Sequence, residues 1–264
     1  MNSSVGKVYL VGAGPGNPDL LTIRAVKLLR KADIVLYDDL VSAGVLKYCK
    51  KSAVLEYVGK RIGQHSCPQT EINRKLGEYA KQYSNIVRLK GGDPSIYGRA
   101  GEEIEYLASL GIDCEILAGV TTASGAASSL GIPLTHREYA REILFLSGHK
   151  KTGKNPESFE DLNLEGKTVL VYMGLNSLES IRENLLESGN SGSTPMAFIE
   201  NATLPNQRLV LANLDTCLDK AEEFQIKTPA LLIFGEIVSF YTELQSLKVE
   251  GRISDKQLIY SQFS

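Results

Sequence analysis

The chain has 264 residues, enough for one large domain or two smaller ones, and its 43% hydrophobic content is ordinary for a globular protein. Lys and Arg total 29 against 31 Asp and Glu, a near balance that argues against bulk nucleic-acid binding. No apolar run reaches the ~20 residues that span a bilayer, and the N-terminus has no signal-peptide pattern. The four cysteines lack CxxC spacing, which predicts reduced thiols in a cytoplasmic protein with neither a zinc site nor disulfides.

The first part of the chain alternates strand and helix patterns, which is typical of an α/β unit with a parallel sheet. A polar cap and a terminal glycine mark two of the helices, at Thr70 and Gly111. The predicted strands are 7–11, 33–37, 54–58, the stretch around Val87 and Leu89, and 114–117. The predicted helices are 20–30, 70–82 and 102–110.

The loop after the first strand contains Gly12, Gly14 and Gly16, which partly matches a dinucleotide-binding fingerprint. A GxGxxG motif that starts at Gly12 needs glycine at position 17, where this chain has Asn17. Pro15 also stiffens a loop that such a fingerprint usually leaves pliant. The pattern therefore indicates a glycine-rich strand end and a weak case for a nicotinamide cofactor.

The stretch from Val87 to Glu103 predicts a buried strand, a glycine-rich turn and the start of a helix. Gly91 and Gly92 allow the backbone to lie directly against a ligand. Asp93 is a good N-cap and Pro94 suits the first turn of a helix. In an open α/β sheet, ligands bind at the carboxyl ends of strands. A capped turn without a ligand is the commoner explanation of such a motif taken alone.

A second α/β pattern follows a segment of small residues, 119–130, which alone fits a helix start or a linker. We expect domains at 1–118 and 119–246 and a polar tail at 247–264. The polar stretch 150–163 predicts a surface loop. The predicted strands are 143–147, 168–173, 195–199 and 230–234, with 208–212 as an antiparallel partner. The predicted helices are 178–188 and 214–224.

Six segments occur in the order typical of one known family. They are GAGPGNPDLLT, YDDLVS, VGKRIG, VRLKGGDPSIYGRAGEE, GIPLTHR and YMGL. Together they closely resemble the tetrapyrrole methylases over residues 5–245, in a stand-alone form without a dehydrogenase/chelatase module. The resemblance implies two α/β domains with S-adenosylmethionine bound in the cleft between them. It also implies methylation of uroporphyrinogen III at C2 and C7 to give precorrin-2, and a homodimer.

The resemblance assigns roles to individual residues. Asp38 matches the proposed proton acceptor and Lys60 the proposed proton donor, although Lys60 could instead grip a substrate carboxylate, because an ordinary lysine is a poor acid near neutral pH. The implied cofactor contacts are Pro15, Gly91, Gly92, Asp93, Ile96, Thr121, Thr122, Met173, Ala202 and Gly235. The departures from the family pattern are Asp39, Ala118, Thr122 and Ala202, which replace Arg or Asn, Pro, Ala and Gly.

The implied substrate carries eight carboxylates, so a nearly neutral chain needs a local basic cluster to receive it. Each candidate is, taken singly, more often a solvated surface charge. The candidates are Arg61, Arg99, Arg137, Arg141, Lys150 and Lys151. The histidines show no metal-ligand spacing, so no metal is expected. Three rival functions stay open: a sibling methylase acting on a later corrinoid, a nicotinamide-dependent oxidoreductase and a non-catalytic tetrapyrrole carrier.

Overall fold

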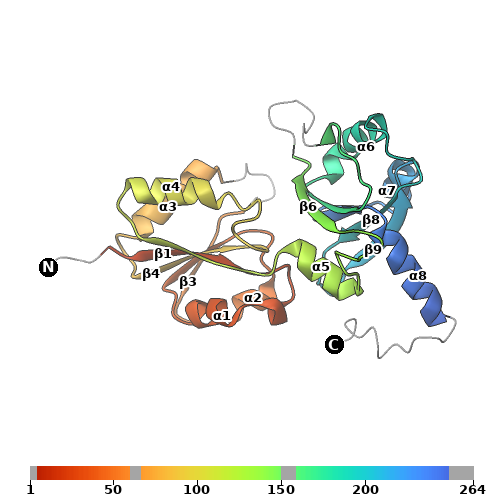
Figure 1. The fold of residues 1–264 in the computed structure, drawn as a ribbon. Coiled ribbons are helices and arrows are strands. Elements are labelled where there is room, and N and C mark those ends of the chain that lie inside the picture. Colours follow the sequence, from red (N-terminus) through yellow and green to blue (C-terminus); the bar gives the residue numbers. More distant parts are fainter. Residues whose placement is uncertain (1–4, 60–66, 150–158, 250–264) are drawn as a thin grey trace. The chain divides into compact units, whose positions relative to one another are not determined.

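The structure is a computed structural model that describes residues 5–59, 67–149 and 159–249 (Figure 1). The chain forms two compact units, Met1–Thr122 and Ala123–Ser264. Each unit contains one five-stranded sheet with helices packed on it, so the predicted fold class of two α/β units is confirmed. The small-residue segment Gly119–Leu130 crosses the division, and its second part is helix α5 (Thr122–Leu130).

The sheet of the first unit is parallel throughout, in the order β3-β2-β4-β1-β5. Its strands are β1 (Lys7–Gly12), β2 (Ile34–Tyr37), β3 (Val54–Tyr57), β4 (Asn85–Lys90) and β5 (Cys114–Leu117). Its helices are η1 (Pro18–Leu20), α1 (Ile23–Leu29), α2 (Ala43–Leu46), α3 (Gln69–Tyr79) and α4 (Ala100–Ser109). Each predicted strand of this unit is confirmed.

Side chains that alternate along the strands build a hydrophobic core on each face of this sheet. Val8 and Leu10 pack toward α3 and α4, whereas Val11 packs toward α1 and α2 (Figure 1). Adjacent strands β1 and β4 therefore continue into helices on opposite faces. Their carboxyl ends form a topological switch point, the place where open α/β sheets bind ligands.

The sheet of the second unit is mixed, in the order β6-β7-β10-β8-β9. Only β6 and β7 pair in parallel. Its strands are β6 (Glu142–Ser147), β7 (Lys167–Tyr172), β8 (Pro195–Glu200), β9 (Arg208–Asn213) and β10 (Ala230–Phe234). Besides α5, its helices are η3 (Leu175–Ser177), α6 (Leu178–Glu187), α7 (Cys217–Glu223) and α8 (Ile237–Val249). One core lies against α6 and α7, the other against α5 and α8.

Two predictions about where helices begin were wrong, and one helix was not predicted. Helix α4 begins at Ala100 and not at the Asp93–Pro94 pair. Helix α3 begins at Gln69 after Pro68, so Thr70 lies in its first turn and is not its cap. Helix α8 was not predicted, and it runs past residue 247, where the tail was expected to begin.

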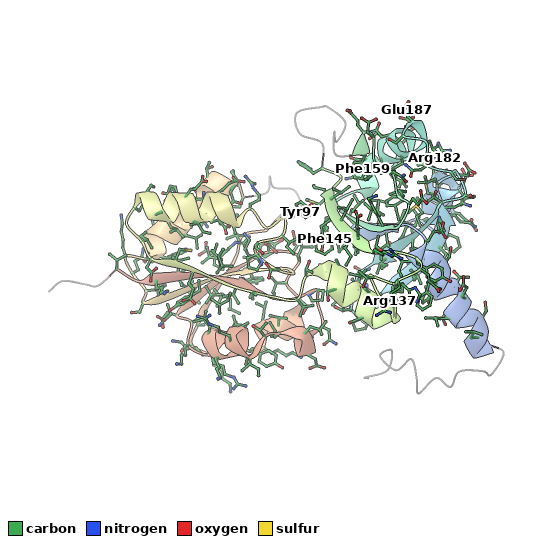
Figure 2. All side chains as sticks on the ribbon, in the orientation of Figure 1. Tyr97, Arg137, Phe145, Phe159, Arg182 and Glu187 are labelled. Carbon is green, nitrogen blue, oxygen red and sulfur yellow. The ribbon has the colours of Figure 1, made fainter. Side chains whose placement is uncertain are left out.

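The predicted surface loop 150–163 is described only from Phe159 onward. Phe159 is fully buried and packs into the core beneath α6 (Figure 2). Glu160, Asp161 and Asn163 are exposed, so the described part of the stretch lies at the surface and is anchored by one buried side chain. Among the described helices, none combines the length and apolar character that a membrane crossing requires.

Candidate functional site

Three glycines meet backbone to backbone at the carboxyl edge of the first sheet. Gly12 ends β1, Gly92 follows β4 and Gly119 follows β5. A Cβ atom on Gly119 would lie 2.3 Å from the carbonyl oxygen of Gly92 and 2.8 Å from the Cα of Gly12. Contacts this short exclude any side chain at this position. The three loops therefore form an edge of bare backbone, in which Gly12 and Gly92 are buried and Gly119 is half-buried.

The loops after β1 and β4 are also tied together by hydrogen bonds. The amide of Gly14 donates to the carbonyl of Gly92 at 3.1 Å, and the amide of Gly92 donates to the carbonyl of Gly14 at 2.7 Å. Both glycines have a positive φ, 72° and 66°, which glycine adopts without strain. Pro15 follows Gly14 directly, so this pairing fixes where the Pro15 loop lies against the Gly92 loop.

The Asp93 carboxylate braces two loops and does not cap a helix. Its Oδ1 accepts hydrogen bonds from the backbone amide (2.8 Å) and the hydroxyl of Ser95, and its Oδ2 accepts from the amide of Gly119 (2.9 Å). Tyr97 and Arg99 then adopt left-handed backbone angles, with φ of 52° and 56°, which delay the helix until Ala100. A carboxylate that bonds across to Gly119 explains why a sequence typical of a helix start forms a turn here.

The structure brings most of the predicted cofactor residues of the first unit to this one edge. The Cβ position of Gly92 would lie 3.5 Å from the Thr122 hydroxyl and 4.0 Å from the Cα of Thr121. Ile96 lies in the same turn, since its amide donates to the Asp93 carbonyl at 3.2 Å. Gly91 faces the loop after β2, where Leu40 would be 2.6 Å from an added Cβ.

Asp38 follows β2 at the same carboxyl edge and is held by two hydrogen bonds. Its Oδ2 accepts from the guanidinium of Arg88 at 2.7 Å and its Oδ1 accepts from the amide of Leu40 at 3.2 Å. The Asp38 side chain is 25% exposed, whereas that of Arg88 is 5% exposed. The Asp38 carboxylate is thus held by two bonds to the protein, while part of its surface stays exposed to solvent.

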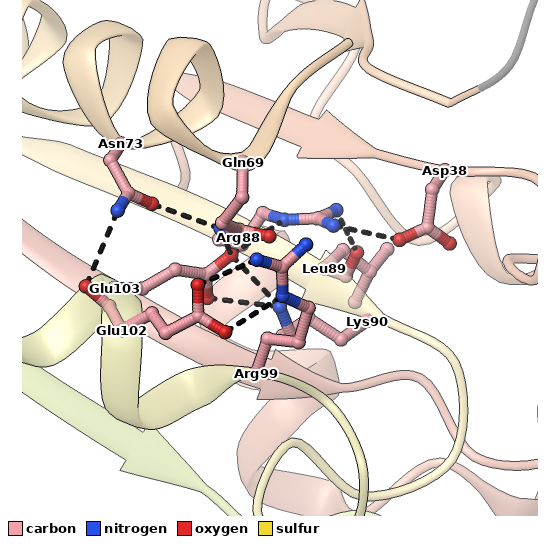
Figure 3. A network of polar contacts seen from close by, with 9 residues as sticks. All are labelled: Asp38, Gln69, Asn73, Arg88, Leu89, Lys90, Arg99, Glu102 and Glu103. Atoms are coloured by element: carbon pink, nitrogen blue, oxygen red, sulfur yellow. Dashed lines mark hydrogen bonds and ion pairs between the residues drawn. The ribbon is translucent and has the colours of Figure 1, made fainter. Parts of the chain in front are cut away.

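Arg88 belongs to a buried ionic network that the sequence analysis missed (Figure 3). Both carboxylate oxygens of Glu103, which is fully buried, accept from the Lys90 ammonium at 2.9 Å. Gln69 donates to the same carboxylate at 3.0 Å, and Arg88 Nε lies 3.5 Å from it. Burial, and then the nearby charge of Arg88, hold the pKa of the Lys90 ammonium below its usual value. Alternation along β4 was the available signal, because Arg88 and Lys90 share a face with buried Ile86.

The second unit places its predicted cofactor residues at two different ends of its sheet. Met173 follows β7 and Ala202 follows β8, and antiparallel β10 between them begins at this end, where Ala230 pairs with Glu200. Gly235 follows the other end of β10, and its amide donates to the Pro195 carbonyl at 2.9 Å. The five residues of β10 span ~16 Å at ~3.3 Å per residue, so Gly235 is not brought together with Met173 and Ala202.

The predicted basic residues within the described part of the chain are divided between the two units, with Arg99 in the first and Arg137 and Arg141 in the second. Arg99 pairs with Glu102 through two hydrogen bonds of 2.8 and 2.6 Å, and its side chain is 56% exposed. Arg141 precedes β6 at the Gly235 end of the second sheet, where its Nε donates to the Arg137 carbonyl at 3.1 Å. Four further predicted residues lie outside the described residues: Lys60, Arg61, Lys150 and Lys151.

Neither metal nor thiol chemistry has a visible centre in the part of the chain that the structure describes. No group of three or more His, Cys, Asp or Glu side chains there is arranged to hold a metal ion. Burial raises the thiol pKa of Cys49, Cys114 and Cys217 to about 11, which disfavours the reactive thiolate form.

Comparison with known proteins identifies relatives along nearly the whole chain. A siroheme synthase from Azotobacter vinelandii is 46% identical over 251 residues, which are 95% of this chain and 54% of that protein. A siroheme synthase from Acinetobacter baylyi is 46% identical over 242 residues, 92% of this chain and 53% of that protein. The chain therefore spans about half the length of these curated relatives.

Solved structures show the same fold. A uroporphyrin-III C-methyltransferase from Thermus thermophilus, complexed with S-adenosylhomocysteine, matches with a TM-score of 0.77 and 38% identity, over 89% of this chain and 100% of that one. A cobalt precorrin-4 methyltransferase matches with a TM-score of 0.77 and 27% identity, over 88% of this chain and 95% of that one. The family profile of the Tetrapyrrole (Corrin/Porphyrin) Methylases matches residues 7–217. With this match and the shared two-sheet fold, the chain belongs to the tetrapyrrole methylase family.

Proposed function

We propose that this chain is a uroporphyrinogen-III C-methyltransferase. It methylates uroporphyrinogen III at C2 and C7 to give precorrin-2 through precorrin-1, with two S-adenosylmethionines consumed, in siroheme or cobalamin biosynthesis. The observation that carries the proposal is the bare backbone edge at Gly12, Gly92 and Gly119, in a chain 38% identical to a uroporphyrin-III methyltransferase solved with S-adenosylhomocysteine.

The residues at this edge fit the cofactor chemically. Its amino-acid part needs acceptors for an ammonium and donors for a carboxylate, and its adenosine needs hydrogen bonds and an apolar surface. Backbone amides and carbonyls around Pro15, Gly91 and Gly92 supply the polar groups, and Asp93 adds a carboxylate that is only half-buried. Thr121, Thr122 and Ile96 lie beside them, so the first unit holds one face of the cofactor.

From the second unit we propose Met173 and Ala202 as cofactor contacts. They share one end of their sheet, and Met173 is 50% exposed although it carries a large apolar side chain. Its backbone also adopts a left-handed φ of 55°, a conformation that occurs disproportionately at functional sites. The position of Gly235 at the opposite end argues against grouping it with these two.

When bound, S-adenosylmethionine supplies a methyl group: the pyrrole carbon forms the new bond with its π electrons, and the carbon–sulfur bond breaks with its electron pair left on sulfur. Asp38 is proposed to stabilise the cationic ring that results and to accept the proton it must lose. Lys60 is proposed either as the proton donor or as an ion-pair partner of a substrate carboxylate. Arg99 is proposed to exchange its exposed partner Glu102 for a substrate carboxylate, because such a surface ion pair is worth only ~0–1 kcal/mol.

Arg61, Arg137, Arg141 and Lys150 remain proposed substrate contacts. Arg137 and Arg141 lie at the end of their sheet opposite Met173, so they are the weaker members of this set. We further propose a cytoplasmic homodimer, on the strength of the family resemblance and of four free cysteines.

Incubation of the protein with uroporphyrinogen III and S-adenosylmethionine under reducing conditions tests the proposal. We expect a dimethylated tetrapyrrole by mass spectrometry, with S-adenosylhomocysteine as co-product. Methylation of a later corrinoid alone would favour the sibling methylase. Calorimetry with S-adenosylhomocysteine and with NAD separates the nicotinamide enzyme, since only the true ligand binds tightly.

A further inference from the structure

Arg88 is an unusual residue for the middle of a five-stranded sheet. It lies in β4, the central strand, between the buried residues Val87 and Leu89, and its own side chain is 5% exposed. A guanidinium taken out of water costs several kcal/mol, and an apolar side chain of similar size is often no worse for stability. Its presence at this position is therefore poorly explained by stability alone.

The contacts of Arg88 point it toward Asp38. Glu103 is the other carboxylate within reach, but its two oxygens are already bonded to Lys90 at 2.9 Å, and Arg88 Nε is 3.5 Å away. The short contact of the guanidinium is the 2.7 Å bond to Asp38 Oδ2. A second bond from Arg88 to the Leu89 carbonyl, at 3.0 Å, fixes the plane of the guanidinium itself.

Asp38 is in turn fixed at both oxygens. The Arg88 bond holds Oδ2, and the Leu40 amide holds Oδ1 at 3.2 Å, so the carboxylate can neither rotate nor change rotamer without losing a bond. A charge-assisted bond of this kind is about twice as strong as a neutral one. Figure 3 shows Arg88 between Asp38 and Glu103, and Lys90 in contact with the same Glu103 carboxylate.

We propose that Arg88 is a positioning residue, which orients the Asp38 carboxylate for the reaction and is itself held by its bond to the Leu89 carbonyl. This inference rests on the proposed function, in which Asp38 acts on the substrate. A small misplacement of a reacting group is enough to lower a rate by ~100-fold. Loss of Arg88 should therefore lower kcat through Asp38 and leave cofactor binding unchanged.

A double-mutant cycle tests this role. The variants Arg88→Met, Asp38→Asn and the double variant are compared with the wild type for kcat, KM and the Kd of S-adenosylhomocysteine. We expect Arg88→Met to lower kcat at least ~10-fold in the wild-type background but by less than twofold in the Asp38→Asn background, because residues that act as a unit are not additive. The Kd should stay within twofold throughout.

Lys50 provides a matched control, because its partner Asp33 directly precedes β2 as Asp38 directly follows it. It donates to Asp33 Oδ1 at 2.7 Å at the opposite end of β2, so Lys50→Met also removes a cation from an aspartate beside β2. We expect kcat to be unchanged in this variant. If Arg88→Met does not fold, Arg88→Lys replaces it in the cycle. Lysine keeps the positive charge, but it lacks the planar guanidinium whose N–H groups bond to Asp38 and to the Leu89 carbonyl at the same time.

Equal losses of kcat in both backgrounds, or no loss in either, would overturn the role of Arg88. A wild-type chain that forms no methylated product would contradict the proposed function itself. The wild-type assay therefore separates failure of the function from failure of this inference.

Discussion

The absence of a side chain at Gly12, Gly92 and Gly119 lets three loop segments touch through their backbones. Each of these residues follows or ends a different strand of one parallel sheet. The contact leaves amide and carbonyl groups, and no Cβ atom, at the edge where the switch point lies. The proposed binding surface therefore depends on the absence of a side chain at all three positions.

Substitution of Gly119 tests this dependence. A Cβ in Gly119→Ala would lie 2.3 Å from the Gly92 oxygen, so we expect a loss of ~1–3 kcal/mol in the free energy of unfolding and at least ~10-fold weaker binding of S-adenosylhomocysteine. Gly101→Ala is the control, because nothing lies within 4 Å of its Cβ position and it sits in α4. That variant should bind normally and gain up to ~1 kcal/mol from helix propensity. Calorimetry and urea unfolding measure both; normal binding by Gly119→Ala would contradict the proposed edge.

Arg99 combines a left-handed backbone with an exposed charge, so its two properties can be tested apart. Arg99→Gly removes a strain of ~1–2 kcal/mol and an ion pair worth ~0–1 kcal/mol. We expect the free energy of unfolding to hold or rise by ~1 kcal/mol while KM for the tetrapyrrole rises ~10-fold. Gln225→Gly is the control, since Gln225 has a φ of 49° but no proposed substrate role. An unchanged KM in Arg99→Gly would rule out the proposed ion pair between Arg99 and a substrate carboxylate.

Most of the helices and strands could be predicted from the sequence, because the spacing of apolar residues and the glycines at element ends are local signals. The exceptions depend on partners far along the chain. Asp93 and Pro94 are typical of a helix start, but the Asp93 carboxylate bonds to Gly119, 26 residues away. Likewise, alternation along β4 places Arg88 and Lys90 on the face of Ile86, but nothing local indicates that β4 is the central strand, so the depth of their burial could not be predicted.

Helix α8 is a different case, because its signal was present in the sequence and was overlooked. Ile237, Val238, Phe240 and Tyr241 follow helical spacing, and they pack on the second sheet. The site shows the same division. Motifs single out Gly91, Gly92 and Asp38 as candidate site residues, whereas the contact of Gly119 with Gly92 and the separation of Gly235 from Ala202 depend on the fold.

Removal of a buried side chain tests how firmly α8 belongs to the second unit. Ile237 is fully buried, so Ile237→Ala should lower the free energy of unfolding by ~2–5 kcal/mol. Ser246→Ala, on the exposed side of the same helix, should change it by less than ~0.5 kcal/mol. Urea unfolding followed by circular dichroism measures both. Equal stability of the two variants would show that α8 is not part of the packed core.

The whole molecule consists of two units with separate hydrophobic cores. The buried clusters of the first unit contain residues from Val8 to Leu117, and those of the second contain residues from Ala123 to Val238. A protein built in this way need not unfold in one step. We expect each sheet, together with its own helices, to unfold as an independent cooperative unit.

Calorimetric scans of two core variants test this independence. Leu107 packs in the first unit and Phe198 in the second, and both are fully buried. Replacement of either residue by alanine should cost ~2–5 kcal/mol. We expect Leu107→Ala to lower the temperature of one transition and Phe198→Ala that of the other. Two variants that shift a single common transition would contradict separate unfolding.

The reciprocal bonds between Gly14 and Gly92 have a consequence for motion. Because each amide donates to the other residue's carbonyl, separation of the two loops breaks both bonds and exposes both amides to solvent. The two loops, 78 positions apart in the chain, should therefore open in a single event and show the same protection in hydrogen exchange. A molecule bound to only one of these loops would slow exchange at both.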